Sequence, residues 1–380
     1  KPEVLAQLPG HMAIGHTRYS TTGDSKMLNA QPFSVTCNKG PIAVAHNGNI
    51  TNAAELRREL EADGSIFQAT SDTEVILHLV ARSRERTMAG ALREAPTMTG
   101  PFERHHPPHA AVVTAVAVAL AEDLGVMGDI TTACTVDDDT AVTASFVARQ
   151  EGVVAGTACV TETYRQVDPR VEVQWLRLDG DELAACDVIG TVTGPVRSVL
   201  TGERVALNFM GHLSGVATLT NRYVRAARGQ VRVLDTRKTI PGLRALQKSA
   251  VRAGGGSSHR DSLSDAVLFK DNHLAVLGIT RAVERARSRW PGRMVEVECD
   301  TLEQVAEALA ARADRIMLDN MTLDEVRSAV ALCGGAVALE VSGGVTLDTI
   351  GEYAVTGIDF VSVGALTHSA RVLDIGLDFP

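Results

Sequence analysis

Aromatic side chains are scarce in this chain of 380 residues, because Phe, Trp and Tyr together make up only 4% of it. The hydrophobic core must therefore rest on Ala, Val, Leu and Ile, and 45% of the residues are hydrophobic. No apolar run approaches the ~18 residues that a membrane-spanning helix needs, and the N-terminal residues form no signal-peptide pattern. These absences favour a globular protein, and a chain of 380 residues is long enough for two or three domains.

Cysteine pairs with metal-binding or redox spacing are also missing. The six cysteines form no C-x-x-C pair, so we expect small core residues in a reducing cytoplasm. A basic overall charge is absent too: the net charge of −9 argues against a nucleic-acid partner. The cysteines are Cys37, Cys134, Cys159, Cys186, Cys299 and Cys333.

Positive charge is nevertheless concentrated in one part of the chain. Residues 222–260 contain ten Lys or Arg and a single acidic residue, Asp235. Fixed cations gathered in an acidic protein suit an anionic ligand, and Arg in particular suits carboxylate and phosphate. A solvated basic helix face is the alternative explanation. The ten cations are Arg222, Arg225, Arg228, Arg232, Arg237, Lys238, Arg244, Lys248, Arg252 and Arg260.

From residue 229 onward, short β-branched runs alternate with helical patterns. Nearly continuous apolar runs in such an alternation predict a parallel sheet. Each run ends in polar, charged or glycine residues on its C-terminal side, where a β/α barrel keeps its active site. The six runs are 231–239, 266–273, 294–300, 315–320, 337–344 and 359–366.

The ends of these runs carry two kinds of chemistry. The carboxylates of Glu298 and Asp319 suit Mg²⁺ or ribose hydroxyls, or else form ion pairs with neighbouring cations. The glycines near 343 and 364 either expose N–H groups to a phosphate or form ordinary turns. The earlier run ends supply side chains that are cationic or can become so: Arg237, Lys238, His259, Arg260 and Lys270.

Ordered motifs over about residues 98 to 380 resemble the quinolinate phosphoribosyltransferase family, the nicotinate-nucleotide pyrophosphorylases (carboxylating). The resemblance implies an α/β sandwich over residues 98–210 and an open six-stranded α/β barrel over 211–380, whose last residues return to the sandwich. The motifs are GDITT (128–132), LNFMGHLSG (207–215), DTRKTIPGLR (235–244), GGGSSHR (254–260), LFKDNH (268–273), VEVECDTLEQ (295–304), IMLDN (316–320) and EVSGGV (340–345).

The resemblance also implies a reaction of NAD biosynthesis. Quinolinate and 5-phosphoribosyl 1-pyrophosphate would give nicotinate mononucleotide, CO₂ and pyrophosphate, with Mg²⁺ bound largely through substrate and water. Residues expected to hold the two quinolinate carboxylates are Arg237, His259, Arg260, Lys270 and, from the second subunit of a homodimer, Arg204. Lys238, Glu298 and Asp319 would be the catalytic and phosphoribosyl residues, Glu298 and Asp319 also the metal residues, and Ser342, Gly343 and Gly364 the 5′-phosphate residues.

A long helix is predicted over residues 202–228. Arg204, Asn208 and His212 fall at i, i+4 and i+8 and form one polar stripe on it. Small residues on this helix permit close packing at a dimer or domain contact. His212 is either a site residue or a core residue with its polar atoms satisfied. Two small residues depart from the family pattern next to the site, Ser249 and Ser258.

Residues 1–97 carry a different signature: GHTRYSTTG (15–23), NAQPF (29–33), AHNGNITN (45–52) and TSDTE (70–74). It resembles the glutaminase domain of amidophosphoribosyltransferase, a class II glutamine amidotransferase of the N-terminal-nucleophile type. The resemblance implies that Arg18 and Asp72 grip glutamine, while Asn47 and Gly48 form an oxyanion hole. The nucleophile of that family is an N-terminal cysteine, whereas position 1 here is Lys.

We therefore predict that residues 1–97 are an incomplete and catalytically inactive fragment, joined to the transferase near residues 96–98. Its apolar strands would lack partners, because about half of a two-sheet sandwich is missing. Two alternatives remain open at this point. The whole chain could be a glutamine-dependent amidotransferase of purine biosynthesis, or the fragment could sense glutamine and regulate the barrel.

Overall fold

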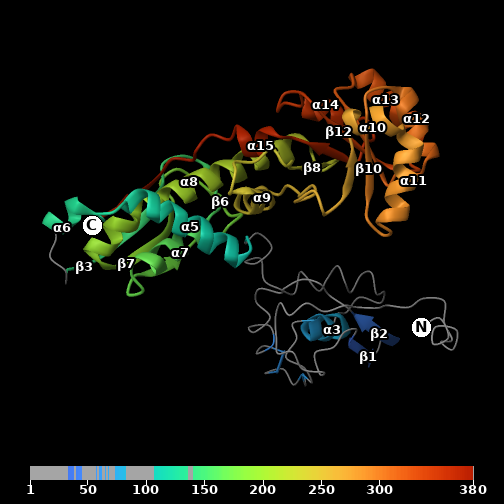
Figure 1. The fold of residues 1–380 in the computed structure, drawn as a ribbon. Helices are drawn as coiled ribbons and strands as arrows, with labels where there is room; N and C mark the ends of the chain where they lie inside the picture. Colours follow the sequence, from blue (N-terminus) through green and yellow to red (C-terminus); the bar gives the residue numbers. More distant parts are fainter. Residues whose placement is uncertain are drawn as a thin grey trace. The chain divides into compact units, whose positions relative to one another are not determined.

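The computed structural model divides the chain into two compact units, Lys1–Arg104 and His105–Pro380 (Figure 1). It describes residues 33–37, 40–44, 57, 60–61, 65, 67, 73–82, 107–135 and 140–379. Four residues predicted to form the vestigial glutamine site lie outside these ranges, as does the predicted junction at 96–98. The four are Arg18, Asn47, Gly48 and Asp72.

The described part of the first unit has a small core of its own. Strands β1 (Phe33–Cys37) and β2 (Gly40–Val44) form an antiparallel pair, and helix α3 (Thr73–Arg82) contacts both. Ile42 of β2 and Val75 and Val80 of α3 are buried in this core. The expectation that the apolar strand at 40–44 lacks a partner is therefore wrong, since β1 supplies one.

Six parallel strands of the second unit form one open sheet, as the sequence predicts. Their order is β8-β13-β12-β11-β10-β9, so β8 and β9 are the two edges and do not pair with each other. Parallel pairing places all six carboxyl ends on one rim. The strands are β8 (Arg232–Leu234), β9 (Val267–Phe269), β10 (Val295–Cys299), β11 (Arg315–Asp319), β12 (Ala338–Ser342) and β13 (Phe360–Ser362).

Helices connect these strands and complete the barrel. Capping boxes fix two of their starts: Thr301 accepts from the N–H of Gln304, and Thr322 accepts from the N–H of Glu325. The run predicted over 266–273 is shorter as a strand, because α10 already begins at Asp271. The helices are α9 (Arg244–Ala253), α10 (Asp271–Leu277), α11 (Ile279–Arg289), α12 (Leu302–Ala310), α13 (Leu323–Cys333), α14 (Ile350–Ala354) and α15 (Ala365–His368).

An antiparallel sheet with the order β14-β3-β7-β5 forms the sandwich, together with α5, α7 and the first part of α8. The last strand, β14, comes from the C-terminus of the chain and pairs with β3. A separate pair, β4-β6, lies in the same part of the chain. The elements of this part are α5 (His109–Leu124), α6 (Ile130–Thr135), β3 (Ala141–Ala148), β4 (Gly152–Val153), α7 (Thr157–Val167), β5 (Glu172–Trp175), β6 (Glu182–Leu183), β7 (Val188–Pro195) and β14 (Ile375–Asp378).

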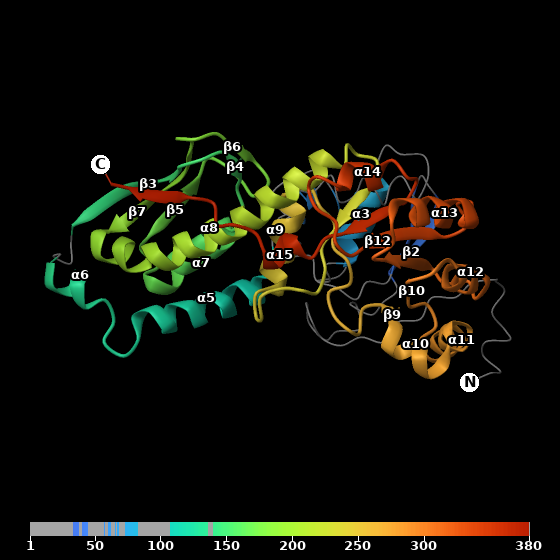
Figure 2. The ribbon, with the colours of Figure 1, turned by 90° about the horizontal axis from the view of Figure 1, so that it is seen from above.

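Helix α8 (Val196–Ala226) links the sandwich and the barrel (Figure 2). Its first half buries Val199 and Met210 in the sandwich core, and its second half buries Val216 and Tyr223 in the barrel core. The helix begins at Val196 and not at residue 202, where the sequence predicted its start. Gly202 lies inside it because a Cβ there would come within 2.8 Å of the Tyr164 ring.

The five cysteines that the structure describes as unpaired do not all lie in the core. Cys159, Cys299 and Cys333 are buried, and burial raises the pKa of Cys159 and of Cys299 to about 12. Cys134 and Cys186 are exposed, so the prediction of core positions is wrong for these two.

Among the helices described here, none combines the length and the apolar character needed to cross a bilayer.

Candidate active site

The strand register places the predicted carboxylates on the inner face of the barrel. Glu298 of β10 is paired with Met317 of β11, and Asp319 of β11 is paired with Ser342 of β12. Side chains alternate along a strand, so residues at these registers share one face. Glu298, Asp319 and Ser342 therefore meet at the carboxyl rim, as the run ends predicted.

A predicted substrate cation and a predicted metal ligand are ion-paired across this rim. Lys270 follows β9, and its Nζ lies 2.7 Å from Oε2 of Glu298. The Lys270 side chain is about half exposed, whereas that of Glu298 is mostly buried. The ion-pair alternative for Glu298 is thus observed.

Lys238 lies close to the predicted phosphate loop after β13. A Cβ added to Gly364 would come within 3.1 Å of Cδ of Lys238, which shows how near the two residues are. Thr367 of α15 donates to the carbonyl of Lys238 at 2.8 Å and holds this backbone in place. Gly343 has φ +93° and has no room for a side chain against Asn320. A glycine is required there whether or not a phosphate binds.

Arg237 and Arg260 lie close enough for their positive charges to interact. Burial, followed by the charge of Arg237, lowers the pKa of Arg260. Nε of Arg237 is buried and has no hydrogen-bond partner, whereas Arg260 donates one bond, to the carbonyl of Ala266 at 3.0 Å. Neither guanidinium forms an ion pair within residues 107–135 and 140–379. Two close, half-buried guanidiniums of this kind suit an anion.

His259 is buried, and both of its ring nitrogens contact the protein. Nδ1 accepts the backbone N–H of Arg260 at 2.7 Å, and Nε2 lies 3.0 Å from Oε2 of Glu296 and 3.5 Å from Oε2 of Glu340. Burial lowers the pKa of His259, but the two carboxylates outweigh this effect and raise the pKa above its usual value. Direct contact between His259 and a substrate therefore stays a prediction.

The two glutamates below His259 form a polar cluster inside the barrel. Both are fully buried, and Arg315 donates to Glu340 at 2.9 Å while its guanidinium lies 4.2 Å from the centroid of the Phe360 ring. Burial, followed by the charge of Glu296, raises the pKa of Glu340 to about 7. His259, Glu296 and Glu340 have the spacing of metal ligands. Because the Arg315 guanidinium already lies 2.9 Å from Glu340 and 4.0 Å from Glu296, we assign no metal to this cluster.

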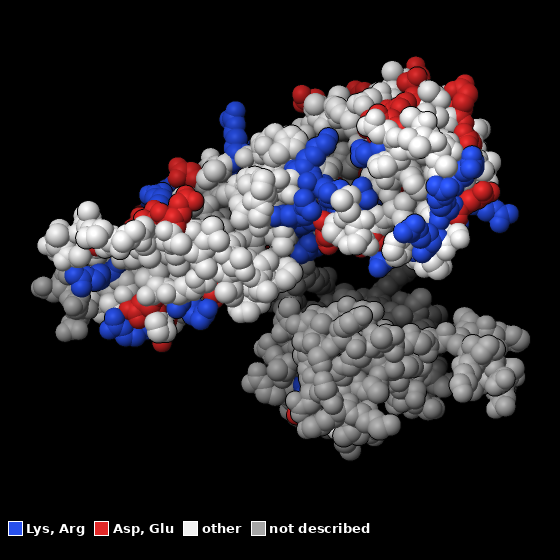
Figure 3. All heavy atoms as spheres, in the orientation of Figure 1, with Lys and Arg blue, Asp and Glu red and all other residues white. Residues whose placement is uncertain are grey.

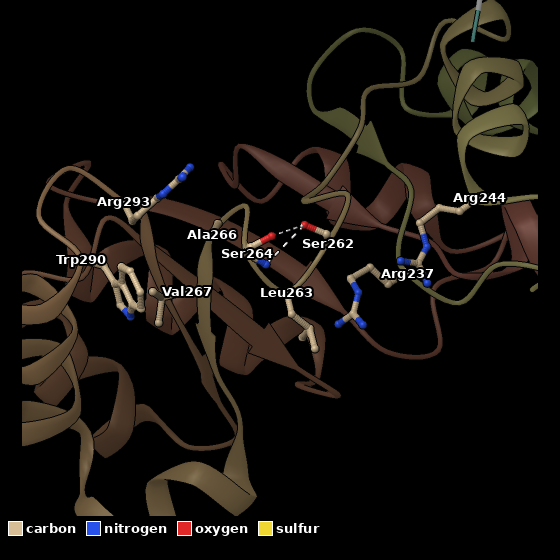
Figure 4. A pocket seen from close by; sticks show the side chains of 9 residues that line it. All are labelled: Arg237, Arg244, Ser262, Leu263, Ser264, Ala266, Val267, Trp290 and Arg293. Carbon is tan, nitrogen blue, oxygen red and sulfur yellow. Dashed lines mark hydrogen bonds between the residues drawn. The ribbon is translucent and has the colours of Figure 1, made fainter. Parts of the chain in front are cut away.

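A pocket of about 690 Å³ opens beside Arg237 (Figure 4). Arg237 and Arg244 lie on one side of it, Trp290 and Arg293 lie on the other, and the segment from Ser262 to Val267 lies between them. Its volume is in the range of small-molecule sites. Trp290 and Arg293 lie in the link before β10, and the pattern of strand ends does not point to them because this link is not at the carboxyl rim.

The concentration of positive charge is only partly a binding surface. Figure 3 shows Lys and Arg side chains gathered on one face near β8 and α9. However, Lys248 is only 2% exposed and pairs with the fully buried Asp235, while the exposed Arg225 pairs with Glu182. The interpretation of all ten cations as one group was therefore too broad. Arg237, Lys238 and Arg260 remain as candidates for an anion site.

The polar stripe on α8 divides into an exposed part and a packed part. Arg204 and Asn208 are exposed, and Arg204 makes no ion pair or hydrogen bond within the described ranges of the second unit. Nε2 of His212 lies 3.0 Å from Nε2 of Gln247, and burial lowers the pKa of His212. Gln247 also donates to the carbonyl of Thr367 at 2.7 Å. His212 is thus a partly buried residue that connects α8 to α9.

The carboxylate oxygens at the rim fit a hard cation such as Mg²⁺. Oxygen ligands from one or two carboxylates, completed by water and substrate phosphates, are typical of Mg²⁺ sites. Glu298 and Asp319 come from neighbouring strands and offer such oxygens. Lys270 pairs with Glu298 at the same rim.

The second unit is similar to known proteins over nearly all of its length. The nicotinate-nucleotide pyrophosphorylase (carboxylating) of Mycobacterium leprae is 45% identical over 270 residues, which are 68% of this chain and 94% of that protein. The chloroplastic enzyme of the same name from Arabidopsis thaliana is 42% identical over 282 residues, which are 69% and 81%. The solved nicotinate-nucleotide pyrophosphorylase of Francisella tularensis has a TM-score of 0.70 at 40% identity and covers 73% of this chain and 99% of that one.

A sandwich followed by an open parallel barrel with an ionic rim defines a barrel-type phosphoribosyltransferase. Two family models agree with this class, "Quinolinate phosphoribosyl transferase, N-terminal domain" over residues 129–214 and "Quinolinate phosphoribosyl transferase, C-terminal domain" over 216–378. The chain belongs to the quinolinate phosphoribosyltransferase family. In addition, residues 6–91 match the model "Glutamine amidotransferase domain".

Proposed function

We propose that this chain transfers a phosphoribosyl group to quinolinate and decarboxylates the product. The pyridine nitrogen forms a bond to the anomeric carbon of 5-phosphoribosyl 1-pyrophosphate while the bond to pyrophosphate breaks. The bond from ring carbon 2 to its carboxylate then breaks, CO₂ leaves, and a proton takes its place to give nicotinate mononucleotide. The observation that carries this proposal is the pair of neighbouring arginines, Arg237 and Arg260, whose guanidiniums form no ion pair within residues 107–135 and 140–379.

Each group at the rim has a task in this reaction. Quinolinate carries two adjacent carboxylates, so a receptor needs several fixed cations, and Arg237, Arg260 and Lys270 meet this need. Their attraction orients the pyridine nitrogen toward the sugar, and this positioning supplies a large part of the rate. The carboxylates of Glu298 and Asp319 at the same rim stabilise positive charge that develops on the ribose.

Mg²⁺ would neutralise the leaving pyrophosphate. Glu298 and Asp319 are the residues that we propose to hold it, largely through water and substrate. Lys238, Ser342, Gly343 and Gly364 would bind the phosphoribosyl group. We also propose that the reaction takes place in the cytoplasm, as the cysteine pattern predicted.

Replacement of a proposed metal ligand tests this division of tasks. We expect Asp319→Asn to lower kcat/KM for 5-phosphoribosyl 1-pyrophosphate on the order of 10²-fold and to raise the Mg²⁺ concentration that gives half-maximal rate. Chelation of Mg²⁺ should stop the wild-type reaction. Steady-state kinetics over a Mg²⁺ titration measure both effects. Asp300→Asn, which alters an exposed carboxylate one residue beyond β10, should behave like the wild type. An unaltered Mg²⁺ dependence in Asp319→Asn would remove Asp319 from the metal site.

A homodimer with shared active sites completes the proposal. Arg204 lies on the first half of α8, which packs in the sandwich core, whereas the rim belongs to the barrel. Its side chain is exposed, so it is available to reach the barrel of a second copy. The measurement that tests this arrangement is the mixing of two variants described below.

Removal of residues 1–97 should leave the transferase reaction unchanged, because every proposed site residue lies in the second unit. The test compares turnover of the shortened and full chains, each with and without glutamine. A rate that responds to glutamine only in the full chain would support a regulatory fragment and contradict this expectation. Release of ammonia from glutamine by the full chain would revive the amidotransferase alternative.

A further inference from the structure

Lys248 is a buried cation whose hydrogen bonds all go to the protein. Its Nζ donates to Oδ1 of Asp235 at 2.8 Å, to the carbonyl of His259 at 2.8 Å and to the carbonyl of Arg260 at 3.2 Å, and it lies 3.0 Å from Oδ1 of Asp261. An ammonium group has three hydrogens, so none remains for a ligand. Lys248 therefore does not contact substrate, although it lies in the basic segment.

Asp235 holds the same segment from its other side. Its Oδ1 accepts the backbone N–H of His259 at 2.9 Å in addition to the bond from Lys248. The two side chains come from different elements, since Asp235 directly follows β8 and Lys248 lies on α9. Together they fix one N–H and two carbonyls of residues 259 and 260. Two successive carbonyls tied to one buried cation restrict the backbone from which the Arg260 side chain extends.

This restriction matters because regular backbone pairing with the β8 segment extends only as far as Ser257. Ser257 exchanges backbone bonds with Val233 and Asp235, and regular pairing stops there. Beyond it, the Arg260 guanidinium interacts with the charge of Arg237 and forms no ion pair within residues 107–135 and 140–379. Two like charges repel each other, so their approach must be maintained by the surrounding structure.

We infer that Asp235 and Lys248 are positioning residues, which hold the backbone of His259 and Arg260 so that the Arg260 guanidinium stands ready for a carboxylate of the substrate. The inference rests on the proposed function and extends it to two residues that touch no substrate. It assigns the first residue of the DTRKT segment a structural task and explains why the one acid of the basic segment is buried.

Loss of the Lys248 ammonium should weaken quinolinate use far more than phosphoribosyl pyrophosphate use. We expect Lys248→Met to raise KM for quinolinate on the order of 10- to 100-fold, because a small misplacement of a binding group has effects of this size. The KM for 5-phosphoribosyl 1-pyrophosphate should stay near the wild-type value. Ser249→Ala is the matched control, since Ser249 is the next residue on α9, is equally buried and has an Oγ without a partner.

Lys248→Met also leaves Asp235 buried without its counter-ion, so the double variant Asp235→Asn/Lys248→Met separates positioning from stability. Removal of both charges should return Tm toward the wild-type value, because neutral replacements of a buried ion pair are well tolerated. The quinolinate KM should remain raised, since the carbonyls of His259 and Arg260 still lack their donor. A double variant in which Tm and quinolinate KM both recover would overturn the inference.

The outcomes for the wild type and for Lys248→Met distinguish the two proposals. If the wild type is active and Lys248→Met keeps the wild-type KM for quinolinate, the positioning role is wrong and the proposed function stands. If the wild type forms no nicotinate mononucleotide at all, the proposed function is wrong and the positioning role falls with it.

Discussion

Arg260→Ala should nearly abolish the use of quinolinate. Removal of one partner from a desolvated charge pair costs about 2 to 5 kcal/mol, so kcat/KM for quinolinate should fall on the order of 10²- to 10³-fold. The loss is large because Arg237 and Lys270 alone cannot hold both quinolinate carboxylates in the orientation that the reaction needs. Steady-state kinetics with saturating 5-phosphoribosyl 1-pyrophosphate measure the effect.

The matched control for this prediction is Arg232→Ala. Arg232 is an exposed cation at the first residue of β8, and the carboxyl rim lies at the other end of this strand. Its removal changes the net charge by the same amount and should leave both KM values unchanged. Equal losses in the two variants would mean that Arg260 acts through general electrostatics and not through contact with the substrate.

Mixing Arg204→Ala with Arg260→Ala should restore activity that neither variant has alone. If Arg204 serves the barrel of its partner, each mixed dimer holds one site with both arginines and one site with neither. Random exchange of subunits then gives about one quarter of all sites intact, and activity should approach about one quarter of the wild-type value. The measurement is turnover after the two inactive variants are denatured and refolded together.

A mixture that stays as inactive as its components would place Arg204 and Arg260 in the same chain's site, or would leave Arg204 outside the site. The control is a mixture of Arg237→Ala with Arg260→Ala. Both of these residues lie at one barrel rim, so a mixed dimer contains no intact site and should show no recovery. The contrast between the two mixtures therefore identifies the residue that crosses the interface.

The arrangement of the barrel could be predicted well because its signals are local. Each strand is a short apolar run, and parallel order follows from the alternation with helices. The prediction that Glu298 and Asp319 meet at one rim needed only the direction of the strands. It holds because register pairs Asp319 with Ser342, and Glu298 with Met317 two residues before Asp319.

The same patterns could not predict which charged side chains are buried in ion pairs and which are exposed. A charge count treats Lys248 and Lys238 alike. Lys248, however, is buried in an ion pair with Asp235, whereas Lys238 is exposed. The difference depends on how α9 packs beside β8, which brings together residues 13 positions apart. His259 was likewise assigned to the substrate by resemblance, whereas its ring contacts Glu296 and Glu340 from other strands.

The predicted start of α8 is wrong at a glycine that packs closely against another part of the chain. The helix was predicted to start at Gly202, whereas α8 starts at Val196. The helix continues through Gly202 back to Val196. A glycine is found at this position because the Tyr164 ring occupies the space that a side chain would need. Such a contact spans 38 positions in the sequence and leaves no local pattern.

The most direct test is the formation of nicotinate mononucleotide by the purified chain supplied with quinolinate, 5-phosphoribosyl 1-pyrophosphate and Mg²⁺. Quinolinate labelled in the 2-carboxylate lets the release of CO₂ be measured in the same reaction. The account predicts equal amounts of nucleotide, CO₂ and pyrophosphate from the wild type, and almost none from Arg260→Ala. No nucleotide from the wild type, or equal rates from the two proteins, would contradict it.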